Sequence, residues 1–357
     1  MNKIAYLQDW AVRYFHQTKF DLATSGLPWQ GTALPARFDA ARWLRASAHE
    51  TNLALRERLA EHCGAELACV FPTLGATNGI FLLALALGRS GPVLVESPAY
   101  EPLWRSFEAF GAELRSFRRI RQERYSLGAS LEQAHRLSRG CACVVVTNPH
   151  NPSGQYDSPG VIRALAEAVA PAWLVVDEVY TPFIPGAVSA WGVAQNVCIV
   201  SSLTKAYGFD FARCGWVAAP PLLAEQLERA QYYTPGLFPS AVSAVALTAL
   251  EDLGAHYRVV SAHVAGRADR VDQALAESSR LAWLRPAGEL IIASVELLGV
   301  EDDQRFARVF MAAHDCALAP GSFFGEPGTI RLGFGALPEQ FDPALPLLLD
   351  FAEHYRE

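Results

Sequence analysis

The sequence predicts an α/β fold, with a large domain built on a mainly parallel sheet flanked by helices and a smaller α+β domain. Short β-branched runs that are apolar throughout alternate with helical stretches, as expected of parallel strands covered on both faces. The chain has 357 residues, and 51% of them are hydrophobic. A single core stops growing at roughly 250–300 residues, so two domains are expected.

The elements of the large domain begin with an amphipathic helix expected over residues 51–62. The apolar runs predict strands at 93–96, 143–146, 174–176 and 198–201. Helices are predicted between some of these strands, at 79–87 and 158–169. We expect this alternation to fill a large domain at residues 45–255.

The remaining elements are assigned to the smaller domain, at residues 1–44 and 256–357. Apolar groups at helical spacing over residues 4–16 predict a helix, and a loop is expected at 22–28. A long helix is expected over 256–277, followed by the strands and helices of a separate unit.

Charge and composition favour small molecules and a second copy of the chain as partners. The formal net charge is −7, and no basic block has the density of a nucleic-acid-binding stripe. The longest apolar run, at 80–87, is far shorter than the ~20 residues that span a bilayer, and no secretory signal is visible. The seven cysteines form no CxxC pair, which indicates a reduced, cytoplasmic protein without a zinc site.

Distinctive polar residues follow three of the predicted strands. They are TNPHNPSG at 147–154, DEVY at 177–180 and SSLTK at 201–205. In an open parallel sheet, functional groups gather in the loops after the carboxyl ends of the strands. We therefore expect these three segments to form one site.

Lys205 and Asp177 each have two interpretations when taken alone. Lys205 is either a surface lysine with a buried stem or a desolvated amine with a lowered pKa, able to attack a carbonyl. Asp177 is either a helix N-cap or a buried carboxylate facing a cation, such as a protonated pyridine nitrogen.

A phosphate site is suggested by TLGATNG at 73–79, because small residues and hydroxyls precede an apolar helix there. Ser202 and Arg213 have the chemistry to complete such a site, although a capped turn would also explain the segment. The chain contains no P-loop, no GxGxxG fingerprint and no GxSxG elbow. Common nucleotide-binding and hydrolase functions therefore lose their main support.

Together these segments resemble fold-type I pyridoxal-phosphate enzymes, specifically the class I/II aminotransferase family, from about residue 22 to 334. SSLTKAYG at 201–208 with RCGW at 213–216 is the most specific match. The segments at 148–154 and 177–180 match next, and SPAY at 97–100 and TIRL at 329–332 also agree with the family pattern.

The resemblance implies a role for each matching residue. Lys205 resembles the lysine that forms the Schiff base with pyridoxal 5'-phosphate and moves the proton, and Asp177 resembles the partner of the pyridinium nitrogen. Tyr180 and Asn151 resemble the pair that hydrogen-bonds the phenolic oxygen of the ring, and Tyr100 the aromatic that stacks on it. The remaining matches are assigned to a phosphate cup (Gly75, Ala76, Thr77, Ser202 and Arg213) and to the substrate's α-carboxylate (Arg331 and Gly26), and Asn151 is also assigned to substrate binding.

The resemblance further implies a homodimer that transfers an amino group between an amino acid and a 2-oxo acid. The tyrosine that the family usually donates to the partner's phosphate has no counterpart before Leu55-Arg56. No Arg or Lys occurs between Arg229 and Arg258, where relatives specific for dicarboxylates commonly carry an arginine. A distal carboxylate would be left without a partner, so a neutral or apolar substrate side chain is expected.

Two other functions are compatible with parts of this pattern. A lyase, a decarboxylase or a cyclase in natural-product biosynthesis would use the same lysine, aspartate and phosphate cup, so the motifs do not separate these reactions. An effector domain of a transcription regulator would need a DNA-binding domain ahead of the fold. The residues before the large domain show no helix-turn-helix pattern, which disfavours it.

Overall fold

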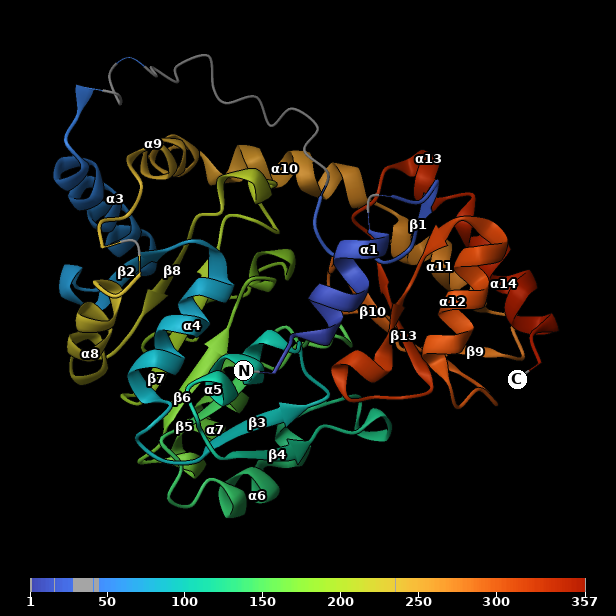
Figure 1. Cartoon of the computed structure of the whole chain (residues 1–357), viewed down its shortest axis with the longest axis horizontal. Helices are drawn as coiled ribbons and strands as arrows, with labels where there is room; N and C mark the ends of the chain where they lie inside the picture. Colours follow the sequence, from blue (N-terminus) through green and yellow to red (C-terminus); the bar gives the residue numbers. More distant parts are fainter. Residues whose placement is uncertain (1, 16, 28–40, 42–44, 235, 357) are drawn as a thin grey trace.

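The protein is described by a computed structural model that covers residues 2–15, 17–27, 41, 45–234 and 236–356. Figure 1 shows a larger part, blue-green to yellow, beside a smaller part, orange to red, with the N-terminal helix between them. No helix within the described residues is long and apolar enough to span a membrane.

A seven-stranded sheet forms the centre of the larger part, in the order β2-β8-β7-β6-β5-β3-β4. Its strands are β2 (Val70–Thr73), β3 (Val93–Ser97), β4 (Leu114–Arg118), β5 (Cys143–Thr147), β6 (Trp173–Asp177), β7 (Val197–Ser202) and β8 (Gly215–Ala218). Only β8 runs against its neighbours; the pairs from β7 through β4 are all parallel. The predicted α/β class with a mainly parallel sheet is confirmed.

Helices cover both faces of this sheet, which explains why its strands are apolar throughout. Successive side chains of a strand point to opposite faces, and alternate residues of β5 accordingly enter two different cores. One core includes α4 (Gly75–Leu87), α5 (Pro102–Ala109) and α8 (Pro221–Gln231). The other includes α3 (Ala48–Cys63), α6 (Leu127–Leu137), α7 (Pro159–Val169) and α9 (Ser240–Ala249).

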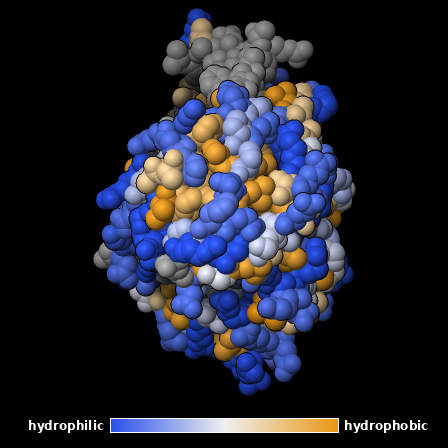
Figure 2. Space-filling view, turned by 90° about the vertical axis from the view of Figure 1, so that its right-hand side faces the viewer, coloured by the Kyte–Doolittle hydropathy of each residue, from blue (hydrophilic) through white to orange (hydrophobic). Residues whose placement is uncertain are grey.

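The smaller part is built on an antiparallel sheet in the order β12-β13-β10-β9. Its strands are β9 (Leu281–Trp283), β10 (Ile292–Leu297), β12 (Ala319–Pro320) and β13 (Thr329–Gly333). Its helices are α11 (Arg267–Leu275), α12 (Asp303–His314), α13 (Pro338–Phe341) and α14 (Ala344–His354). The surface at this end is mostly hydrophilic, with apolar residues gathered in its upper half (Figure 2). This arrangement agrees with the predicted α+β unit.

The N-terminal segment packs against the smaller part. Strand β1 (Phe20–Asp21) pairs in parallel with β11 (Cys316–Ala317). The predicted helix at 4–16 consists of a π-helix, Tyr6–Ala11, followed by α1 (Val12–Tyr14). Residues 16, 28–40 and 42–44 lie outside the described residues, and the domain boundaries at 45 and 255 stay a prediction.

The prediction of one long helix over 256–277 is wrong. Two helices occupy this stretch, α10 (Leu253–Val264) and α11, with Ala265 in an extended conformation between them. Gly266 has a φ of 71°, a left-handed conformation that favours glycine and ends the helical path.

The Asn151 loop, residues 148–154, lies directly against the smaller part. The amide of Ala287 donates to the carbonyl of Gly154 at 2.8 Å. A Cβ atom at Gly154 would lie 2.3 Å from the carbonyl oxygen of Ile292, so only glycine fits this contact. The loop is therefore held from both parts of the molecule.

Candidate active site

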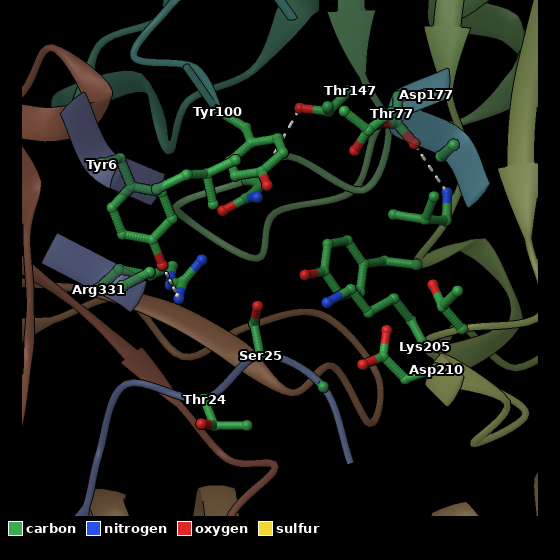
Figure 3. A pocket seen from close by; sticks show the side chains of 18 of the residues that line it. Tyr6, Thr24, Ser25, Thr77, Tyr100, Thr147, Asp177, Lys205, Asp210 and Arg331 are labelled. Carbon is green, nitrogen blue, oxygen red and sulfur yellow. Dashed lines mark hydrogen bonds between the residues drawn. The ribbon is translucent and has the colours of Figure 1, made fainter. Parts of the chain in front are cut away.

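A cavity of about 390 Å³ opens at the carboxyl ends of β5, β6 and β7, between the large sheet, the N-terminal segment and β13. Ten of the twelve predicted site residues line it: Gly26, Ala76, Thr77, Tyr100, Asn151, Asp177, Tyr180, Lys205, Arg213 and Arg331. Asp177 and Lys205 lie on one side, and Arg331 and Tyr6 lie opposite (Figure 3). The other two, Gly75 and Ser202, each contact a lining residue, Arg213 and Thr204 respectively.

Lys205 follows β7 by three residues, and its amine reaches the floor of the cavity. Burial lowers the pKa of this amine from 10.5 to about 8, because desolvation disfavours the charged form. Arg331 and Arg213 lower the pKa further, while Asp210 and Asp177 oppose the shift. Gly26 crosses close by, since a Cβ atom there would lie 3.6 Å from the Lys205 Nζ.

Asp177 is the last residue of β6 and is buried. Its Oδ1 accepts a hydrogen bond from the Val179 amide at 3.1 Å, and no ion pair holds it within the described residues. Burial raises the pKa of this carboxyl to about 7, because the charged form lacks a close counter-ion. A cation bound in the cavity would relieve this penalty.

Asn151 is held in place through its backbone, while its side chain is left free. Its amide donates to the Thr147 hydroxyl at 3.1 Å, and that hydroxyl donates to the Glu96 carboxylate at 2.6 Å. Glu96 in turn pairs with the fully buried Arg119 at 2.7 Å. The Asn151 Oδ1 is buried and has no hydrogen-bond partner within the described residues. A buried polar atom without a partner is available for a hydrogen bond to a ligand.

The neighbouring phenols remain protonated. Burial raises the pKa of Tyr180, with Arg331 opposing the shift. Burial likewise raises the pKa of Tyr100, and the nearby hydroxyls of Tyr6 and Tyr180 add to it. Both rings therefore present neutral hydroxyls to the cavity, able to donate a hydrogen bond.

The start of α4 forms a cup of backbone and small side chains. Gly75 has a φ of 76°, and a Cβ there would lie 3.1 Å from the Arg213 guanidinium. Gly215 of β8 packs behind it, because a Cβ at 215 would lie 2.7 Å from the Gly75 carbonyl carbon. Arg213 pairs with Asp210 at 2.6 Å. The Ser202 hydroxyl forms a hydrogen bond with the Thr204 hydroxyl at 2.7 Å, and Thr204 lines the cavity.

Arg331 projects from β13 and is almost fully buried. Its Nη2 donates to the Ala23 carbonyl at 2.7 Å and to the Tyr6 hydroxyl at 2.8 Å. Its Nε has no partner within the described residues, and no carboxylate pairs with it there. A buried guanidinium without a counter-ion is a site for an anion.

Several lining residues were not predicted from the sequence. Four come from the first fifteen residues: Tyr6, Leu7, Ala11 and Phe15. Their helical spacing was visible, but nothing in the sequence indicates which surface that helix covers. Thr147 and Asp210 also line the cavity, and both stand inside or beside segments that the sequence had singled out.

The cavity fits pyridoxal phosphate. The carboxylate of Asp177, without an ion-pair partner in the described part of the chain, suits a protonated pyridine nitrogen, and the side-chain amide of Asn151 carries an N–H that can donate to the ring's phenolic oxygen. The glycine-lined start of α4 beside Arg213 suits the phosphate. The amine of Lys205 lies between these groups and Arg331 (Figure 3). Fold and site together define a pyridoxal-phosphate-dependent enzyme of the aminotransferase fold.

Comparison with known proteins agrees with this class. The model of the aminotransferase class I and II family matches residues 34–345. The chain therefore belongs to that family and is a pyridoxal-phosphate-dependent aminotransferase. It is 28% identical over 304 residues to the arginine–pyruvate transaminase AruH of Pseudomonas aeruginosa, which covers 80% of this chain and 77% of that protein.

Two solved structures show the same fold. A PLP-dependent aminotransferase from Streptococcus suis has a TM-score of 0.89 and 22% sequence identity, covering 99% of this chain and 98% of that chain. The PLP-dependent cyclase OrfR has a TM-score of 0.84 and 24% identity, with the same two shares covered. At these identities the two structures show the fold alone, which proteins named as an aminotransferase and a cyclase share.

Proposed function

We propose that the enzyme transfers an amino group between an amino acid with a neutral or apolar side chain and a 2-oxo acid, with the cofactor bonded to Lys205. The observation that carries this proposal is the cavity itself. It brings together a desolvated amine, a buried carboxylate and a buried arginine, and neither of the last two has an ion-pair partner among the described residues. These groups suit the cofactor ring on one side and a substrate carboxylate on the other.

Bound pyridoxal phosphate supplies an electron sink for the bonds at the substrate's Cα. In our proposal, Asp177 keeps the proton on the ring nitrogen, which strengthens that sink. Lys205 takes the proton from the substrate's Cα and delivers it to the carbonyl carbon of the cofactor. Its pKa of about 8 suits an amine that must both accept and release a proton near neutral pH. Tyr180 and Asn151 donate to the phenolic oxygen of the ring.

The phosphate is assigned to Gly75, Ala76, Thr77, Ser202 and Arg213. Amide groups at the start of a helix carry partial positive charge, and Arg213 adds a full one. Tyr100 stacks on the ring. Arg331 binds the α-carboxylate through its planar fork, and Gly26 closes over the same carboxylate without a side chain that would block Lys205.

The substrate's side chain is assigned to the wall formed by Leu7, Ala11 and Phe15. The charged residues that line the cavity are Asp177, Lys205, Asp210, Arg213 and Arg331, and each already has a role or a partner in this proposal. Among the described residues none is left to pair with a charged side chain, which would be costly to bury alone. The arginine–pyruvate relative, at 28% identity, makes arginine the competing substrate to test.

The decisive experiment mixes the cofactor-loaded protein with single amino acids and follows the absorbance of the cofactor. Leucine, methionine and phenylalanine should convert it to the pyridoxamine form faster than aspartate or arginine does. Faster reaction with aspartate or arginine would contradict the substrate class. Release of ammonia or carbon dioxide, or a cyclic product, without that conversion would instead favour a lyase, a decarboxylase or a cyclase.

The attachment point of the cofactor has a separate test. Reduction of the loaded protein with borohydride, followed by digestion and mass spectrometry, should identify the modified residue as Lys205. The Lys205→Ala variant should retain its fold and lose the modification. A modified peptide that contains another lysine would contradict the assignment.

We also infer that the enzyme is a homodimer. The N-terminal segment packs inside its own protomer, where Tyr6 and Trp10 are buried. We assign the interface to the loop between α8 and α9, where Tyr232 and Tyr233 are 70% and 83% exposed. Leu237 and, on α3, Leu53 extend this apolar surface, and Asn52 binds the Phe238 backbone beside it.

Such exposed aromatic side chains commonly mark interfaces between proteins. Helices α8 and α9, which this loop connects, lie at the left of Figure 1, away from the end shown in Figure 2. Light scattering should give a dimer at micromolar concentration, and Tyr233→Glu should shift it towards monomer. An active wild-type monomer would contradict this inference. A cytoplasmic location stays a prediction, in keeping with seven free cysteines.

A further inference from the structure

The N-terminal π-helix, Tyr6–Ala11, connects the two halves of the active site through one residue. The backbone amide of Tyr6 donates to the Glu101 carboxylate at 2.7 Å, and Glu101 is itself fixed by Arg105 at 3.0 Å. The hydroxyl of Tyr6 accepts from Arg331 Nη2 at 2.8 Å. Tyr6 thus joins the large domain, at the start of α5, to β13 of the smaller part.

The ring of Tyr6 is fixed on several sides. It is only 3% exposed. Its centroid lies 6.0 Å from that of Tyr100 at an interplanar angle of 80°, and 5.1 Å from that of Phe324. Phe15 closes a further edge at 6.1 Å. Packed aromatic edges leave the ring little freedom, so the position of its hydroxyl is set before substrate arrives.

Arg331 depends on the N-terminal segment for its orientation. Both acceptors of its Nη2, the Tyr6 hydroxyl and the Ala23 carbonyl, belong to that segment. Both acceptors are also uncharged. Burial raises the pKa of Tyr6, with Arg331 partly opposing the shift, so the phenol stays neutral. A carboxylate in the same place would neutralise the guanidinium, whereas a phenol orients it and leaves its charge for a ligand.

We propose that Tyr6 is the positioning residue for Arg331: its hydroxyl holds the guanidinium in the orientation that receives the substrate's α-carboxylate. The proposal rests on the function proposed above for Arg331. Tyr6 acts through Arg331 and takes no part in bond making. Its contribution is therefore to the binding of every carboxylate substrate, whatever the side chain.

The test uses Tyr6→Phe, which keeps the ring and removes the acceptor. The KM for amino acid and 2-oxo acid should rise roughly tenfold, the loss typical of one hydrogen bond to a charged group, while kcat stays within about twofold. The dissociation constant of 3-phenylpropionate, a carboxylate without an amino group, should rise by the same factor in calorimetry. Unchanged KM and binding would overturn the proposal, as would a loss confined to kcat.

A matched control lies one helical turn away. Trp10 donates its indole N–H to the Leu318 carbonyl at 2.7 Å and so anchors the same helix, whereas the hydrogen-bond acceptors of Arg331 among the described residues are Tyr6 and Ala23. Trp10→Phe removes that hydrogen bond and should leave KM unchanged. An equal rise in KM for Trp10→Phe would mean that any loosening of the helix has this effect, and the specific role of Tyr6 would be refuted.

A double-mutant cycle distinguishes the positioning role of Tyr6 from the proposed role of Arg331 as the carboxylate site. If Tyr6 acts through Arg331, Tyr6→Phe should have no further effect on KM in an Arg331→Gln background. Additive effects of the two substitutions would overturn the positioning role. If Arg331→Gln alone leaves KM and 3-phenylpropionate binding unchanged, the carboxylate site itself is misassigned. If Arg331→Gln weakens both and Tyr6→Phe weakens neither, only the role of Tyr6 fails.

Discussion

Burial shifts the pKa values of two titratable side chains in the cavity towards their neutral forms. Lys205 is desolvated, and burial raises the pKa of Asp177 to about 7 because no ion pair within the described residues compensates it. Each shift costs free energy in the empty site, since a buried charge is held without its best partner. A ligand that supplies the missing partners recovers that free energy on binding. This is how a preorganised site achieves affinity.

The reactivity of Lys205 should depend on pH in a characteristic way. Only the deprotonated amine attacks an aldehyde, and a pKa of about 8 means that this form becomes dominant above that pH. The rate at which the cofactor-free protein captures pyridoxal phosphate should therefore rise through pH 8 and level off above about pH 9. Stopped-flow absorbance measures it. A rate that continues to rise past pH 10, as for free lysine, would contradict a buried amine.

Asp210 should weaken the binding of the cofactor's phosphate. Its carboxylate pairs with Arg213 at 2.6 Å, so it competes with the phosphate for the guanidinium and repels it. Because both side chains are about half exposed, the expected gain for Asp210→Asn is modest, roughly two- to fivefold tighter pyridoxal phosphate. Pyridoxal without the phosphate is the control and should bind unchanged. Weaker binding of both ligands would mean that Asp210 is needed to position Arg213.

Single residues also show where interpretation of the sequence reaches its limit. Asp177 and Lys205 were predicted because motifs of fixed spacing carry them at the ends of strands. Tyr6 was missed because its partner, Arg331, lies 325 positions away, and no local pattern encodes that contact. The role of a residue that acts through a distant partner depends on the packing of the whole molecule.

At the scale of elements, the strands of the large sheet were the most predictable. β5 and β6 are apolar on both faces, and this pattern survives in the sequence as an uninterrupted run. The edge strand β4 was missed because Phe117 is its only fully buried residue and arginine occupies two of its positions. The helix break at Gly266 was missed because a single glycine in a sequence is not enough to predict a left-handed conformation.

A side chain larger than hydrogen at Gly215, where β8 contacts the start of α4, should destabilise the protein. A Cβ at Gly215 would lie 2.7 Å from both the Gly75 carbonyl carbon and the Ser201 carbonyl oxygen, and backbone atoms do not yield as side chains do. Gly215→Ala should lower the free energy of unfolding by about 2 kcal/mol and weaken cofactor retention, because the phosphate loop must shift. Denaturant unfolding and dialysis measure the two effects.

Gly160→Ala is the matched control. Gly160 lies in α7, where a Cβ would be 3.7 Å from its nearest neighbour, the Ser158 hydroxyl. Alanine is favoured over glycine in a helix by roughly 0.5–1 kcal/mol, so this variant should be slightly more stable than the wild type. Equal behaviour of the two variants would show that the contact at Gly215 is not tight.

At the scale of the whole molecule, the two parts are joined by more than the chain connection. Tyr6 joins Glu101 to Arg331, Ala287 binds Gly154, and the Glu289 amide donates to the Phe183 carbonyl at 3.0 Å. α10 also spans the top of the molecule from one part to the other (Figure 1). Inter-domain contacts of this number favour folding and unfolding as one unit.

The protein should therefore unfold in one cooperative thermal transition. Burial of shared side chains at the domain interface means that neither part retains its core when the other unfolds. Differential scanning calorimetry of the cofactor-loaded protein should give a single peak, and near-ultraviolet and far-ultraviolet circular dichroism should report the same midpoint. Two resolved peaks would show that the parts are independent.

The Gly154 contact has a consequence for how this enzyme could acquire new substrates. The Asn151 loop is packed against the smaller part so closely that no side chain fits at 154, and substitutions there would disturb both halves at once. The opposite wall is different, because Leu7, Ala11 and Phe15 are only partly buried and belong to a short N-terminal helix. Substitutions that change the substrate range, in nature or in a directed library, are therefore expected at these few N-terminal positions.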